Sequence, residues 1–254
     1  MANQISLPEK ISIIDQKDHR YQVVIEPFYP GFGVTIGNAL RRVLLSALSG
    51  AAVTSFKIDG VQHEFGAVQG IKEDVVEIAL NLKKLRVRVF SDEPVKIKLH
   101  GKGETVLTGA DIEKNSDVEV LNKDMVIATL TDKNSTLNME LVVEKGLGYV
   151  TVEQREKEKL EIGTIAIDAS FSPVLNVGYE IKHVRVGKMT NYEQLTLDLT
   201  TDGTITVDEA IAQASQILAE HFSLWSTATE PVKAKKTKAK KEEETEANIE
   251  AEIE

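Results

Sequence analysis

Cysteine is absent from the 254 residues of this chain. Its absence excludes disulfide frameworks and metal sites built on thiolates, and it suits a reducing compartment. No apolar run approaches the roughly 18 residues that a membrane-spanning helix requires, and the N-terminus lacks the pattern of a secretory signal peptide. We therefore expect a cytoplasmic protein with no membrane partner.

Basic residues are also fewer than acidic ones, 30 against 40. The net charge is −10, and it is still −8 without residues 229–254, which hold six lysines and eight glutamates. A broad nucleic-acid-binding surface would need clustered positive charge to displace phosphate counterions, so the balance disfavours one. Apolar residues make up 42% of the chain, which suffices for real cores in one or two domains.

The segment 31–49 predicts a helix that buries two different faces. At 100° per residue, its apolar arc covers roughly half of the circumference, which is wider than packing on one sheet requires. We therefore expect a second helix as a packing partner. The arc consists of Ile36, Ala39, Leu40, Val43, Leu44, Ala47 and Leu48.

The opposite face of this helix carries Asn38, Arg41, Arg42 and Ser49, with Leu45 among them. Arginine and large apolar side chains are enriched where protein interfaces bind most tightly, so this face indicates a site for another protein. The alternative is a singly exposed leucine, which folded proteins tolerate.

Before this helix, alternating residues 10–26 predict two strands around a turn at 16–18, and Pro27 and Pro30 then interrupt the chain. We expect the helix to end at Ser49-Gly50.

After the helix, the pair Asp59-Gly60 separates two alternating segments, 53–58 and 61–65. Such a pair predicts a β-hairpin with a type I′ turn, which needs positive φ at both central positions.

A second helix is predicted from apolar residues at helical spacing. We interpret Glu73, Asp74 and Glu77 on it as ordinary solvated charge. The apolar positions are Ile71, Val75, Ile78 and Leu82.

Strands are predicted again from residue 85 onward. Segments 85–89 and 95–99 alternate and predict a hairpin, β pattern continues over 117–150, and the polar segment 153–161 predicts an exposed loop. The basic outer face of that hairpin would consist of Arg86, Arg88, Lys96 and Lys98. The remaining predicted strands are 164–169, 177–186 and 195–200.

Thr206 and Glu209 have the spacing of a capping box and predict the start of the last helix. Its apolar stripe is again broad. The stripe consists of Val207, Ala210, Ile211, Ala214, Ile217, Leu218, Phe222 and Trp225.

Catalytic motifs are few. The five histidines form no i, i+4 pair, so no metal site is expected. The one enzyme alternative is Gly31-x-Gly33-x-x-x-Gly37, which opens a helix and has Asp59 at about the distance of a ribose-binding acid. The spacing is one residue too long for a dinucleotide motif, and this alternative stays open here.

Many short segments resemble the N-terminal domain of the bacterial RNA polymerase alpha subunit, in order from about residue 10 to 226. The first helix opens this likeness with Gly31-Phe32-Gly33 and Gly37-Asn38-Ala39-Leu40-Arg41-Arg42. The others are Ile58–Phe65, Gly70–Val75, Asn81–Lys83, Gly148–Val150, Phe171–Val174, Tyr179–Glu180, Arg185–Gly187, Thr201–Ile205, Glu209–Ile211 and Ile217–His221.

The resemblance implies an α+β fold with a discontinuous dimerisation domain, residues 1–49 and 173–228, built from an antiparallel sheet and two long helices. Residues 50–172 would form an inserted β-rich domain. Family members usually continue into a helical C-terminal domain that touches promoter DNA. Here a lysine run and a glutamate run occupy residues 229–254, and we expect this charged tail to be disordered.

The function implied by the resemblance is that of a non-catalytic assembly subunit of DNA-directed RNA polymerase, a nucleotidyltransferase that transcribes DNA into RNA. A homodimer would nucleate the β and β′ subunits, with omega and sigma joining in the holoenzyme. DNA would be contacted only through the assembled enzyme. The catalytic magnesium and its aspartates belong to β′, so no catalytic, metal or cofactor site is expected in this chain.

Residue roles follow from matched positions. The resemblance assigns Arg42 and Leu45 to contact with the β subunit, and Arg41 is added from the same face. Lys83 and Ile167 are assigned to contact with β′. The expected dimer interface consists of Ile36, Leu40, Val43, Leu44, Leu48, Ile211, Ile217 and Leu218.

Overall fold

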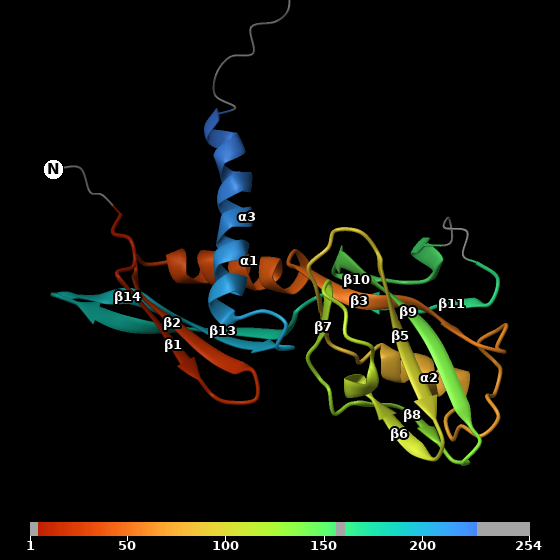
Figure 1. The fold of residues 1–254 in the computed structure, drawn as a ribbon. Coiled ribbons are helices and arrows are strands. Elements are labelled where there is room, and N and C mark those ends of the chain that lie inside the picture. The colour runs from red at the N-terminus through yellow and green to blue at the C-terminus, as the bar shows by residue number, and fades with distance from the viewer. Residues whose placement is uncertain (1–4, 156–160, 228–254) are drawn as a thin grey trace, which may run out of the picture. The chain divides into compact units, whose positions relative to one another are not determined.

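The computed structural model describes residues 5–155 and 161–227. Figure 1 shows the chain. The α-helices are α1 (Phe32–Ser46), α2 (Val75–Leu82) and α3 (Val207–Thr227). The strands are β1 (Lys10–Asp15), β2 (Arg20–Phe28), β3 (Ser49–Ile58), β4 (Val87–Val89), β5 (Val95–Lys102), β6 (Thr105–Thr108), β7 (Val118–Val120), β8 (Val126–Leu130), β9 (Thr136–Leu147), β10 (Tyr149–Val150), β11 (Thr164–Ala166), β12 (Ala169–Ser170), β13 (Val174–Val186) and β14 (Met189–Thr201). This mixture of helices and antiparallel sheets confirms the predicted α+β class.

The first sheet joins the two ends of the chain in the order β1-β2-β14-β13, all antiparallel. Helix α1 lies across this sheet (Figure 1) and packs on β13 and β14. Alternation along β14 directs Leu195, Leu197 and Leu199 into the core beneath the helix. The core of this sheet consists of Val23, Ile25, Phe28, Leu40, Leu44, Leu48, Val174, Val177, Leu195, Leu197, Leu199, Ile205, Val207, Ala210 and Ala214.

Several local predictions near this sheet are confirmed. Segment 10–26 forms β1 and β2, and Lys17, Asp18 and His19 between them all have positive φ. The interruption predicted at Pro27 is wrong, since β2 continues through it to Phe28. Helix α1 ends at Ser46, three residues earlier than expected, because β3 begins at Ser49.

The capping box at the last helix is also confirmed. The backbone N–H of Thr206 donates to Glu209 Oε2 at 3.1 Å, and the backbone N–H of Glu209 donates to Thr206 Oγ1 at 3.3 Å. Helix α3 crosses the boundary between the two compact units of the chain, Met1–Leu218 and Ala219–Glu254.

A second sheet, in the order β11-β3-β9-β5, carries a separate core, against which α2 packs through Val75, Ile78 and Leu82. Every buried residue of this core falls between Val53 and Ile167, and those of the first core lie outside that range. A segment with its own core between two halves of another core is the arrangement of an inserted domain. The bounds predicted for the two domains stay a prediction, and the tail predicted at 229–254 lies outside the described residues.

Two predicted hairpins are wrong. β3 pairs with β9 and β11, and residues 61–65 form no strand. Only Gly60 of the turn pair has positive φ, at 82°, so the turn at Asp59-Gly60 is not type I′. The strands predicted at 85–89 and 95–99 exist as β4 and β5, but they do not pair with each other: β4 pairs with β7, and β5 pairs with β9.

The start of α2 also differs from the prediction. Asp74 is the N-cap and accepts the backbone N–H of Glu77 at 2.6 Å, and Ile71 lies before the helix in a bridge with Leu130. Glu73 is not plain solvated charge, since its carboxylate accepts the backbone N–H of Thr129 at 2.6 Å.

Candidate functional site

The two arginines on the outer face of α1 differ in their contacts. Arg41 Nε donates to the carbonyl oxygen of Val177 on β13 at 3.1 Å, so this side chain ties the helix to its own sheet. Arg42 is exposed, and its guanidinium makes no hydrogen bond or ion pair within the part of the chain that the structure describes. Of the two, Arg42 is therefore the cation available to a partner.

Leu45 is half-buried and packs at the margin of the first core. Its carbonyl oxygen accepts the hydroxyl of Ser172 at 3.2 Å. The side chain thus leaves part of its surface open beside Arg42, one turn away along the helix.

The N-terminus of α1 is occupied by a side chain from β14. Glu193 Oε1 accepts the backbone N–H of Gly31 at 2.9 Å, and Oε2 accepts the backbone N–H of Gly33 at 2.9 Å. Glu193 is only 7% exposed. The carboxylate satisfies N–H groups that every helix leaves unpaired at its start.

This arrangement removes the dinucleotide alternative. A phosphate at the start of α1 would meet the carboxylate of Glu193, and the sheet beside it is antiparallel throughout rather than parallel. The glycine pattern instead reflects the backbone. Gly31 has φ of 89°, and a Cβ on Gly33 would lie 2.8 Å from Glu193 Oε2. Glu193 itself was missed from the sequence, although an acid in register with Leu195 and Leu197 was a usable signal.

Lys83 lies at the end of α2 in a cluster with Asp168. Lys83 Nζ is 3.1 Å from Asp168 Oδ2, which also accepts the hydroxyl of Tyr149 at 2.9 Å. Asp168 Oδ1 accepts the backbone N–H of Val152 at 3.0 Å. We call Lys83, Asp168 and Tyr149 the Asp168 cluster.

The electrostatics of the cluster favour its charged forms. The backbone N–H of Val152, the ammonium of Lys83 and the hydroxyl of Tyr149 lower the pKa of Asp168 to about 2. Partial burial acts to lower the pKa of Lys83, but the hydrogen bond and the charge of Asp168 outweigh it and the net shift is upward. The ammonium also lies 5.8 Å from the centroid of the Tyr149 ring, within cation–π range.

Ile167, the other predicted β′-contact residue, is 5% exposed and belongs to the second core. Its backbone N–H donates to Thr54 O at 3.0 Å, and its carbonyl oxygen accepts Nη2 of Arg155. The structure therefore brings Lys83 close to Ile167, which anchors the connection between β11 and β12 that presents Asp168. Sequence reasoning missed Asp168, which carries no local pattern of its own.

The predicted dimer residues fall into two groups. Leu40, Leu44 and Leu48 are buried in the chain's own core, with at most 4% exposed, so they have little surface left for a second chain. The half-buried residues, which have surface left, are Ile36, Val43, Ile211, Ile217 and Leu218.

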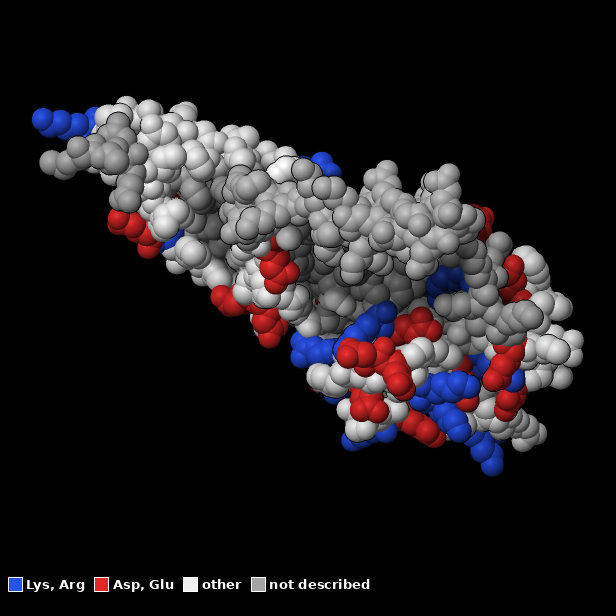
Figure 2. Space-filling view, turned by 90° about the horizontal axis from the view of Figure 1, so that it is seen from above, with Lys and Arg blue, Asp and Glu red and all other residues white. Residues whose placement is uncertain are grey.

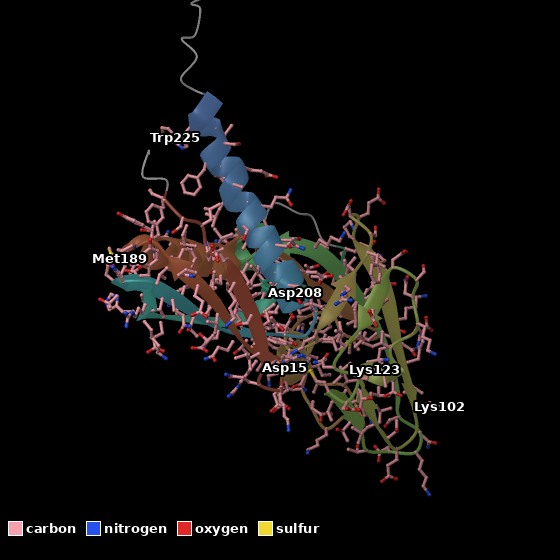
Figure 3. The ribbon with its side chains drawn as sticks, turned by 90° about the vertical axis from the view of Figure 1, so that its left-hand side faces the viewer. Asp15, Lys102, Lys123, Met189, Asp208 and Trp225 are labelled. Atoms are coloured by element: carbon pink, nitrogen blue, oxygen red, sulfur yellow. The ribbon has the colours of Figure 1, made fainter. Side chains whose placement is uncertain are left out.

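The surface charge is mixed. On the face seen in Figure 2, basic and acidic side chains are intermingled rather than separated. Figure 3 labels Lys102 at the end of β5 and Lys123 in the turn between β7 and β8. It also labels Met189 at the tip of the β13–β14 hairpin, Asp15 at the end of β1, and Asp208 and Trp225 near the two ends of α3. In the described ranges, no three potential ligand side chains gather as a metal site would require, and no helix there is long and apolar enough to cross a bilayer.

Comparison with known proteins identifies the family. Residues 56–172 match the model of the RNA polymerase Rpb3/RpoA insert domain. The chain is 49% identical over 224 residues to the DNA-directed RNA polymerase subunit alpha of Symbiobacterium thermophilum, which covers 88% of this chain and 71% of the relative. It is 47% identical to that of Moorella thermoacetica over 232 residues, or 91% and 73% of the two chains. Identity of this extent over nearly the whole chain shows that it belongs to the bacterial DNA-directed RNA polymerase alpha-subunit family.

Proposed function

We propose that this chain is a non-catalytic assembly subunit of DNA-directed RNA polymerase. Two copies form a homodimer, which captures the β subunit with one copy and the β′ subunit with the other, and so prepares the enzyme that transcribes DNA into RNA. The observation that carries the proposal is the exposed guanidinium of Arg42, unpaired within the described residues, beside Leu45 on the outer face of α1.

The β-subunit surface centres on Arg42 and Leu45. A guanidinium without a partner among the described residues breaks no intramolecular contact when it pairs with a complementary carboxylate, and a neighbouring leucine supplies apolar area. Arg41 supports this face from within, because its hydrogen bond to Val177 holds the helix on β13.

The β′-subunit surface centres on the Asp168 cluster. The ammonium of Lys83 and the ring of Tyr149 are partly exposed there and held in a fixed relation by Asp168. An ordered pair of a cation and an aromatic ring is a surface of the kind that interfaces favour. Ile167 contributes by anchoring the connection between β11 and β12 that carries Asp168.

The dimer surface uses the half-buried apolar residues of α1 and α3, namely Ile36, Val43, Ile211, Ile217 and Leu218. An isologous interface pairs the same patch of both copies, so the total apolar area buried is twice the area that one chain contributes. We place the dimer in the cytoplasm, with omega and sigma joining later and DNA contacted only through the assembled enzyme.

Reconstitution tests the proposal. The full-length chain is mixed first with purified β subunit and then with purified β′, and complexes are separated by size-exclusion chromatography with light scattering. We expect a two-copy complex that binds one β subunit and then one β′ subunit. A chain that stays monomeric, or a dimer that binds neither large subunit, would overturn the proposal.

A further inference from the structure

The carboxylate of Glu193 is buried without a cation from the described part of the chain beside it. It lies on the apolar side of β14, in register with Leu195 and Leu197, and is 93% buried. None of the described lysines or arginines forms an ion pair with it. A buried charge needs compensation, and here the two backbone N–H groups at the start of α1 supply it.

Helix α1 depends on this contact in turn. Its N-cap residue, Gly31, has no side chain to cap the helix, and the first turn contains no acidic residue. A helix is usually capped by the side chain of its own N-cap residue. Here the capping carboxylate comes from Glu193 on β14, 162 positions away. The capping carboxylate fixes both the rotation and the axial position of α1, because two separate N–H groups must meet two oxygens.

Two glycines of α1 allow the helix to lie close to the sheet. A Cβ on Gly33 would lie 2.8 Å from Glu193 Oε2, and one on Gly37 would lie 2.8 Å from the Leu195 side chain. The helix backbone at these two positions, one turn apart, thus lies close against side chains of β13 and β14. Further along the same helix, Arg42 and Leu45 occupy the outer face.

We propose that Glu193 is a positioning residue for the β-subunit surface of α1. It contacts no partner, and it acts by holding the helix at the one rotation that presents Arg42 and Leu45 together. This inference rests on the proposed function of that surface.

The test uses the full-length dimer and purified β subunit. Glu193→Gln replaces one acceptor oxygen by an amide group that cannot accept, and Glu193→Asp keeps the charge but is one methylene too short to reach both N–H groups. Glu180→Gln, an exposed carboxylate on β13, is the matched control. Val23→Ala removes buried volume from the same core without touching α1's N-terminus and controls for lost stability.

Two readouts are combined. Amide hydrogen exchange over residues 31–36 should become about tenfold faster or more in Glu193→Gln and less so in Glu193→Asp. Capture of the β subunit should fall at least about fivefold in Glu193→Gln, while sedimentation still shows a dimer. Both controls should capture the β subunit as wild type does.

The inference is overturned if Glu193→Gln captures the β subunit like wild type, or if Val23→Ala loses capture to the same extent. An Arg42→Ala variant, measured in parallel, distinguishes failure of the positioning role of Glu193 from failure of the β-subunit surface itself. If Arg42→Ala weakens capture and Glu193→Gln does not, only the positioning role fails. If Arg42→Ala itself captures normally, the proposed β-subunit surface fails and the inference fails with it.

Discussion

Arg88 on β4 donates from Nε to the backbone carbonyl of Thr204 at 2.9 Å, across 116 positions of the chain, and its Nη2 donates to the same oxygen. Arg86, the residue before this strand, donates from Nη1 to the carbonyl of Asp202 at 2.9 Å. The inserted strand β4 thereby holds the loop that leads into α3. The two arginines predicted to form a basic outer face serve as backbone clamps instead.

Replacing Arg88 by alanine is expected to lower the free energy of unfolding by about 1.5–3 kcal/mol, because a part-buried carbonyl loses charged donors. Urea denaturation measures the change. Arg185→Ala is the matched control, since Arg185 Nε also donates to a carbonyl, that of Gly187, but does so locally and in solvent. Equal losses in the two variants would contradict the clamp.

Asp168 should make stability depend on acid pH. Its pKa of about 2 in the folded chain lies below the model-peptide value of 3.8, so its contribution is present above about pH 4 and is lost as the pH falls through 2. Because the side chain is 32% exposed, we expect about 1–2 kcal/mol after solvent screening. Asp168→Asn should be less stable than wild type at pH 6, and the gap should narrow between pH 4 and pH 2. A gap that is constant with pH would refute this.

Arg42 and Arg41 should have opposite phenotypes. Arg42→Ala is expected to weaken capture of the β subunit by about 2 kcal/mol while leaving the melting temperature unchanged. Arg41→Ala should lower stability by about 1 kcal/mol, because Val177 O loses its donor. Reconstitution and thermal melts on the same samples measure both quantities. The assignment fails if the two variants behave alike.

The dimer is best tested at a residue that is not already in the chain's own core. Leu48 is 1% exposed, so a charge there would unfold the chain rather than report on association. Ile217→Asp on half-buried Ile217 should weaken dimerisation by several kcal/mol by placing a charge in the interface. Ser215→Asp, an exposed neighbour, is the control. Sedimentation at micromolar concentration should show monomer for Ile217→Asp only, and a dimer for both variants would exclude this patch.

Gly50 should not tolerate alanine. A Cβ there would lie 1.8 Å from the carbonyl oxygen of Phe171, so the backbone itself would have to move. We expect Gly50→Ala to cost about 2–3 kcal/mol, in the range of overpacked cores. Gly178→Ala, where the added Cβ would be 3.8 Å from Asp198 Cβ, should be close to neutral. Chemical denaturation of both variants decides, and a neutral Gly50→Ala would disprove the clash.

Features that arise from neighbours in the sequence were predictable. The capping box of Thr206 and Glu209, the strands of 10–26 and the apolar arc of α1 are confirmed, because helix and strand periodicity and cap spacing act over a few residues. The likeness over many short motifs led to the same family that the comparisons show.

Tertiary structure decided everything that joins distant residues. β3 pairs with β9 rather than with residues 61–65, and Asp168 meets Lys83 across 85 positions. Glu193 meets Gly31 and Gly33 across 162 and 160 positions. A carboxylate shows no periodic pattern that names its partner, and a strand's apolar face fits any other face of similar width. Only the packed fold, in which each buried charge and N–H group must find a partner, selects among them.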